Sequence, residues 1–98
     1  MNPQDVLKVI SSFYDIPVEK IKGDSRRKDL VKARQVCMYI LRELVKLSYP
    51  AIGEFFNNKD HTTVMHSCKK IEKEIVKDSV LNSEVESLIE KISYNVFN

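Results

Sequence analysis

The sequence contains few of the residues that break helices or build covalent frameworks. Its 98 residues include two glycines, three prolines and two cysteines. Because apolar residues recur at spacings of three and four rather than two, the sequence predicts an all-α fold without strands and with short connections. Cys37 and Cys68 form no Cys-x-x-Cys motif and lie in periodic apolar stretches, which indicates two buried thiols rather than a disulfide or metal site.

Long hydrophobic runs are also missing. No stretch approaches the roughly 18 to 20 unbroken apolar residues of a membrane span. The first five residues are polar and acidic, whereas a signal peptide begins with basic residues. We therefore expect a cytoplasmic, monomeric protein that does not insert into membranes. The length predicts a single domain over residues 1–98.

The sequence offers no constellation of catalytic residues. It lacks the Gly-x-x-x-x-Gly-Lys-Ser/Thr, Gly-x-Gly-x-x-Gly and Gly-x-Ser-x-Gly motifs of nucleotide hydrolysis, dinucleotide binding and serine hydrolases. His61 and His66 are five residues apart, which is about 140° around a helix, so they cannot hold a metal ion together. We expect no enzyme activity, no metal and no cofactor in this domain.

Charge is distributed unevenly along the chain although its net value is only +2. Residues 20–46 hold nine lysines and arginines against three acids, a net charge of +6. Residues 1–19 carry −2 and residues 78–98 carry −3. This asymmetry is typical of a domain that presents one face to a polyanion. Basic helix faces that are simply solvated remain an alternative.

Apolar periodicity and capping residues predict a compact domain of five to six helices. The strongest pattern, from Asp29 to about Lys46, contains no glycine or proline and predicts the central helix. The other helices are expected from Pro3 to about Tyr14 after an Asn2 cap, within Pro17–Lys22, from the Ser48 cap to about Phe56, from the Asp60 cap to about Lys77, and from Ser83, whose spacing to Glu86 is that of a capping box.

The segment around residues 57–59 has the layout of a helix-turn-helix. A three-residue turn is expected at Asn57, Asn58 and Lys59. Asparagine tolerates left-handed backbone, which such a turn requires. In a helix-turn-helix the first residues of the second helix reach base edges in the major groove. Asp60 can accept a hydrogen bond from a cytosine amino group, and Thr62 can offer a methyl to thymine. An Asp60 that acts only as a helix cap remains equally open.

Three stretches carry a more selective pattern than any short motif. They are Ala-Arg-Gln-Val-Cys-Met-Tyr-Ile-Leu-Arg-Glu-Leu over 33–44, Ser-Tyr-Pro-Ala-Ile-Gly-Glu-Phe-Phe over 48–56, and Lys-Asp-His-Thr-Thr-Val-Met-His-Ser-Cys-Lys-Lys-Ile over 59–71. Together they resemble the C-terminal DNA-binding domain, domain IV, of the bacterial chromosomal replication initiator DnaA. The resemblance covers nearly the whole chain. It implies an all-helical fold with a helix-turn-helix and a basic loop, which binds the DnaA boxes of replication origins as double-stranded DNA.

The resemblance also implies roles for individual residues. Arg26 matches an arginine that enters the minor groove, and the residues from Asp60 match a signature that reads bases in the major groove. Base contacts are implied for Arg26, Arg42, Tyr49, Pro50, Asp60, His61 and Thr62. Phosphate contacts are implied for Lys28, Arg34, Gln35, Lys59, Thr63, His66 and Lys70.

The chain departs from the family pattern at two places and lacks one module. Asn57-Asn58-Lys59 replaces the common Gly-Gly-Arg, and Ser25 stands where a basic residue is common, so we expect a weaker grip on phosphates. The family's ATPase module is absent, which implies a C-terminal fragment of a longer initiator, with ATP bound only by the missing ATPase domain.

A helical interaction module, whose basic face docks on an acidic or regulatory protein, remains the alternative function.

Overall fold

The computed structural model describes residues 1–97, and within that range it contains six helices and no strand. The all-α prediction is therefore confirmed. The helices are α1 (Pro3–Tyr14), α2 (Val18–Lys22), α3 (Lys28–Glu43), α4 (Tyr49–Phe55), α5 (His61–Lys77) and α6 (Ser79–Phe97). None of the helices over residues 1–97 combines the length and the apolar character that crossing a bilayer requires.

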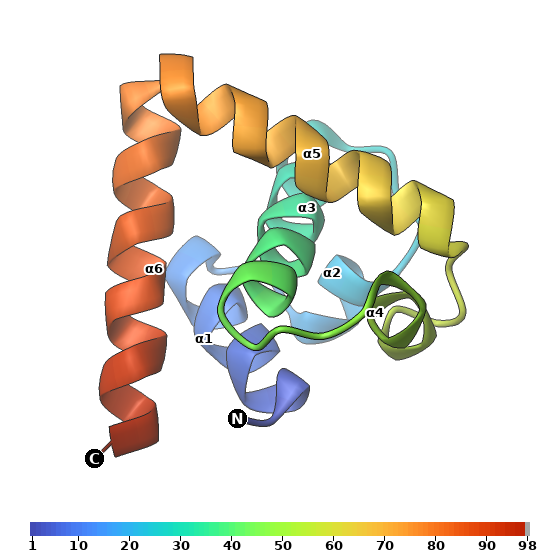
Figure 1. Cartoon of the computed structure of the whole chain (residues 1–98), viewed down its shortest axis with the longest axis horizontal. Coiled ribbons are helices and arrows are strands. Elements are labelled where there is room, and N and C mark those ends of the chain that lie inside the picture. The colour runs from blue at the N-terminus through green and yellow to red at the C-terminus, as the bar shows by residue number, and fades with distance from the viewer. Residues whose placement is uncertain (98) are drawn as a thin grey trace.

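Helix α3 is the central element, as its uninterrupted apolar pattern predicts. It contacts all five other helices, and its residues Ala33, Val36, Cys37 and Ile40 are fully buried. One apolar cluster joins it to side chains from every other helix. Figure 1 shows α5 crossing α3, with α6 on one side of the molecule and α4 on the other. The ends of α4 and α5 that meet at the turn are thus held by the shared core.

Side-chain caps fix where the helix-turn-helix elements begin. The Ser48 hydroxyl accepts a hydrogen bond from the Ala51 N–H at 3.2 Å, and Asp60 Oδ1 accepts one from the Thr62 N–H at 2.7 Å. Asn2 caps α1 in the same way. Each cap pairs an N–H that the helix itself leaves unsatisfied. All three predicted caps are confirmed.

The turn between α4 and α5 depends on close backbone approach. Asn57 and Asn58 have φ values of 59° and 61°, which confirms the predicted left-handed backbone. The Lys59 N–H donates to the Gly53 carbonyl oxygen at 2.9 Å. A Cβ atom on Gly53 would overlap the carbonyl oxygen of Lys59. Glycine is therefore needed where α4 passes the turn.

Helix α3 ends three residues earlier than predicted. Lys46 adopts a left-handed φ of 66°, and the Leu47 N–H donates to the Leu41 carbonyl oxygen at 3.2 Å. This bond closes the helix in the manner usually provided by glycine. The apolar pattern continues past the end of the helix at Glu43, and no glycine or asparagine stands at position 46 to mark that end. The pattern therefore predicts a helix that is too long.

The predicted start of the last helix at Ser83 is wrong, because Asp78 supplies the cap instead. Asp78 Oδ1 accepts a hydrogen bond from the Leu81 N–H at 3.0 Å, and its own N–H donates to the Glu74 carbonyl oxygen at 2.8 Å. One aspartate therefore ends α5 and begins α6 at Ser79. The Ser83 to Glu86 spacing lies inside the helix.

Replacing Asp78 by alanine should lower the free energy of unfolding by about 1 kcal/mol, since a helix cap contributes that amount. The matched variant Ser83→Ala should change it by less than about 0.5 kcal/mol, because an exposed mid-helix serine makes no cap. Urea unfolding followed by circular dichroism measures both. Equal losses for the two variants would contradict the assignment of the cap to Asp78.

The two cysteines are unpaired and buried, as predicted. Burial raises the pKa of the Cys37 thiol, and it raises that of Cys68 to about 11. Both thiols therefore stay protonated at neutral pH, which suits a packing role rather than a reactive one.

Candidate nucleic-acid interface

The first turn of α5 presents polar side chains to solvent. Asp60, His61, Thr62 and Thr63 are all exposed. The hydrogen bond from the Thr62 N–H lowers the pKa of the Asp60 carboxyl, so Asp60 is ionised at neutral pH. An ionised carboxylate accepts hydrogen bonds and donates none. Asp60 thus caps the helix and keeps free lone pairs for a donor outside the protein.

Helix α4 contributes the neighbouring surface. A shallow hollow between α4 and the start of α5 is lined by Pro50, Glu54, Asn58, Lys59, Asp60 and His61. Three of the predicted base contacts, Pro50, Asp60 and His61, therefore share one surface. The carboxylates of Glu54 and Asp60 make it locally acidic. This charge disfavours a phosphate and suits a donor such as the cytosine amino group.

Two further predicted base contacts lie against each other. The guanidinium carbon of Arg42, from α3, is 4.2 Å from the ring centroid of Tyr49 in α4. Arg42 Nη1 also donates to the Leu47 carbonyl oxygen at 3.1 Å. Stacking on the ring and this hydrogen bond hold the guanidinium in one orientation. Arg42 and Tyr49 form a stacked pair beside the start of α4.

The basic loop, residues 23–27, connects α2 with α3 and carries the predicted minor-groove arginine. The side chains of Arg26 and Lys28 are exposed and make no hydrogen bond or ion pair with any residue in 1–97. Arg27, in contrast, pairs with Asp29 at 2.8 Å, and this hydrogen bond lowers the pKa of Asp29. The run of three cations therefore presents two uncompensated charges. Arg26 is free to reach a groove.

Arg34 has a structural role that the resemblance did not imply. Its side chain is buried, with 7% of the residue exposed. Its Nε donates to the Ile21 carbonyl oxygen at 2.7 Å, Nη1 to that of Ser25 at 3.1 Å, and Nη2 to that of Lys20 at 3.4 Å. Arg34 therefore holds α2 and the basic loop against α3. The implied phosphate contact of Arg34 stays a prediction beside this structural role.

Lys59 also departs from its predicted phosphate contact. Its Nζ donates to the carbonyl oxygens of Lys22 at 3.4 Å and Gly23 at 3.2 Å, and to Asp24 Oδ1 at 2.6 Å. An ammonium group has three N–H donors, so all are engaged. Asn57 Nδ2 donates to the same Lys22 carbonyl at 3.1 Å. The turn before α5 is thus tied to the basic loop, and Lys59 has no donor left for a phosphate.

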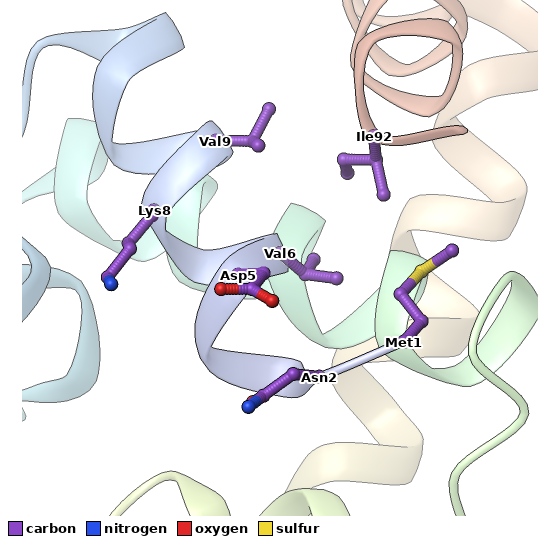
Figure 2. A pocket seen from close by; sticks show the side chains of 7 residues that line it. All are labelled: Met1, Asn2, Asp5, Val6, Lys8, Val9 and Ile92. Carbon is purple, nitrogen blue, oxygen red and sulfur yellow. The ribbon is translucent and has the colours of Figure 1, made fainter. Parts of the chain in front are cut away.

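A separate hollow lies between α1 and α6, as Figure 2 shows (lined by Met1, Asn2, Asp5, Val6, Lys8, Val9 and Ile92). None of the predicted DNA-contacting residues lines it. Over the described range 1–97, no group of three metal-ligating side chains occurs there or elsewhere. The residues with binding chemistry therefore gather around α4, the start of α5 and the basic loop.

Residues 3–71 match the protein-family model described as the bacterial DnaA protein helix-turn-helix. The chain belongs to this family. Its helix-turn-helix consists of α4, the turn at residues 56–60 and α5.

Individual relatives agree with this assignment. The chain is 43% identical over 93 residues to the chromosomal replication initiator protein DnaA of Trichormus variabilis, which covers 95% of this chain and 20% of that protein. The DnaA protein of Citrifermentans bemidjiense is 46% identical over 87 residues, covering 89% of this chain and 19% of that protein. A crystal structure of a DNA replication initiation factor superposes with a TM-score of 0.74 at 27% identity, over 92% of this chain and 30% of that chain. The chain spans about a fifth of the length of these DnaA relatives.

The other predicted phosphate contacts of this DnaA-family domain are accessible to different degrees. Lys28, Thr63, His66 and Lys70 are exposed, and Gln35 is half-buried on α3. Their contacts with DNA stay predictions. Residues that were not predicted as site residues, Asp24, Asp29 and Asn57, set the position of the basic loop or the charge on it. Their partners depend on tertiary packing, and only Arg27 to Asp29 is a local spacing that a sequence could reveal.

Proposed function

We propose that this domain binds double-stranded DNA during initiation of chromosomal replication, and that it binds specifically at the DnaA boxes of the origin. Membership of the DnaA helix-turn-helix family supports DNA binding. The observation that carries the proposal is the exposed first turn of α5. The contact between Lys59 and Asp24 joins the segment before this turn to the loop that carries Arg26. A site of this form can read two adjacent grooves at once.

The start of α5 enters the major groove in this proposal. B-form DNA has a major groove about 12 Å wide, which admits a helix with a diameter of about 10 to 12 Å. Thr62 and the ionised Asp60 then face base edges, and His61 lies beside them. Arg26 enters the neighbouring minor groove, where a narrow groove concentrates negative potential and attracts an arginine. Lys28, Thr63, His66 and Lys70 supply phosphate contacts.

The domain is assigned no catalytic step. A helix-turn-helix is a binding unit, and its output is the position of the protein on DNA. ATP is expected only in a separate ATPase domain of a longer initiator. A regulatory protein that docks away from the first turn of α5 would leave that turn accessible to DNA.

A titration of a DnaA-box duplex against a scrambled duplex, followed by fluorescence anisotropy at two salt concentrations, tests the proposal. We expect the box to bind at least about tenfold more tightly at both salts, a difference of about 1.4 kcal/mol. Affinity for both duplexes should fall as salt rises, because phosphate contacts release counterions. Equal, weak binding to the two duplexes would contradict sequence-specific recognition and favour a protein-interaction module.

Neutralising Lys70 should weaken binding to both duplexes alike. Lys70 is exposed on α5, and loss of one phosphate contact should make the slope of log affinity against log salt shallower by about one. Lys91→Ala, which removes an exposed lysine from α6, is the matched control and should leave the slope unchanged. A loss that depends on the duplex sequence would show that Lys70 does not act through phosphate.

A further inference from the structure

The basic loop is held from both sides immediately before Arg26. On one side, the Lys59 ammonium binds acceptors on three consecutive residues, 22–24. On the other side, Arg34 of α3 binds the carbonyl oxygen of Ser25. Arg26 is the next residue and is exposed. The backbone that leads to the minor-groove arginine is therefore restrained, while its side chain is free.

Lys59 is also fixed at its own backbone. Its N–H donates to the Gly53 carbonyl oxygen at 2.9 Å, which places it against α4. Asp60, the cap of α5, follows it directly in the chain. A single residue thus connects α4, the first turn of α5 and the basic loop.

We propose that Lys59 is a positioning residue that sets the distance between the major-groove reader at the start of α5 and the minor-groove reader Arg26. This inference rests on the proposed function. A loop that is already in its bound position does not lose conformational entropy when DNA binds, so preorganisation increases affinity. Lys59 then contributes to recognition of the box without touching DNA.

The surroundings of Lys59 favour this role over a phosphate contact. Its side chain is 15% exposed, whereas that of its partner Asp24 is 92% exposed. Turning the ammonium towards a phosphate would leave the Lys22 and Gly23 carbonyl oxygens without this donor, which costs free energy. The ion pair also compensates the charge of Asp24, which would otherwise repel the phosphates beside Arg26.

The double variant Lys59→Met/Asp24→Asn removes the ion pair without changing the net charge of +2. We expect it to bind the DnaA-box duplex about tenfold more weakly, because the loop must be ordered on binding. The salt slope should equal that of the wild type, since no phosphate contact is lost. In the free protein, amide relaxation measured by nuclear magnetic resonance should show increased motion of residues 23–27.

Combining this double variant with Arg26→Ala measures the energetic coupling between the Lys59–Asp24 ion pair and Arg26. We expect Arg26→Ala to weaken box binding about tenfold in the wild type and less than about threefold once the ion pair is removed, because coupled residues are not additive. The guanidinium of Lys59→Arg can donate to the same acceptors. In the Lys59→Arg background, Arg26→Ala should therefore weaken box binding about tenfold, as in the wild type. Lys91→Met/Glu90→Gln, on α6, is a charge-matched control that should bind like the wild type.

Each alternative gives a different result. Additive costs of the two changes would overturn the positioning role, because they would show that Lys59 and Arg26 act independently. A salt slope that becomes shallower by about one would show instead that Lys59 contacts a phosphate. If the double variant failed to fold, Asp24→Asn, which removes the ion pair, would measure the same coupling, with Lys59→Arg, which keeps the donors, as its control. A wild type that bound box and scrambled duplexes equally would overturn the proposed function itself, whereas normal discrimination with additive costs would overturn only this inference.

Discussion

Gly53→Ala is expected to lower the free energy of unfolding by about 3 kcal/mol, because an added methyl group overpacks a site that has no room. The new Cβ would overlap the Lys59 carbonyl oxygen, which is backbone and cannot move like a side chain. Relief requires α4 to move away from the turn before α5, and that movement breaks the hydrogen bond from the Lys59 N–H to Gly53. Urea unfolding followed by circular dichroism measures the loss.

Gly23→Ala is the matched control. A Cβ on Gly23 would lie 3.3 Å from the Glu19 carbonyl oxygen and 3.7 Å from that of Lys20, so a small shift accommodates it. Its φ of −74° is open to alanine. We expect a change in unfolding free energy of less than about 1 kcal/mol. Similar losses for Gly23→Ala and Gly53→Ala would contradict the close approach of α4 to the turn.

Thr62→Ala should weaken binding to a DnaA-box duplex by about 1 to 3 kcal/mol and have little effect on a scrambled duplex. Thr62 is exposed at the first turn of α5, where its methyl and hydroxyl groups can face a base edge in the major groove. Alanine keeps the helix and removes both interactions. Fluorescence anisotropy with the two duplexes measures the difference.

The neighbouring Thr63→Ala provides a matched comparison. Thr63 is assigned to a phosphate, so its replacement should weaken binding to the two duplexes equally. Both variants should retain the wild-type circular dichroism spectrum, since neither side chain is buried. A uniform loss for Thr62→Ala would show that Thr62 contacts the DNA backbone and reads no base.

The sequence predicts most of the fold because the signals for these helices are local. Asn2, Ser48 and Asp60 cap helices through bonds to residues two or three positions away, so sequence patterns reveal them. The helix boundaries that were wrong lack such signals. Lys46 adopts left-handed backbone without being glycine or asparagine, and Asp78 competes with a second plausible cap at Ser83.

The candidate site is predictable only where exposure follows from helix periodicity. Thr62 and His66 lie opposite the buried Val64 and Cys68 stripe, as a helical wheel requires. Long basic side chains are different, because tertiary packing decides where their charges go. Lys59 meets an aspartate 35 residues away, and no pattern in the sequence connects them.

Nuclear magnetic resonance of the isotope-labelled protein, titrated with a DnaA-box duplex, tests the DNA-reading role of α5 and the basic loop most directly. We expect the amide signals of residues 60–63 and Arg26 to shift, while those of Val9 and Ile92 at the hollow between α1 and α6 stay in place. Shifts confined to other residues, with residues 60–63 and Arg26 unchanged, would contradict the proposed mode of binding.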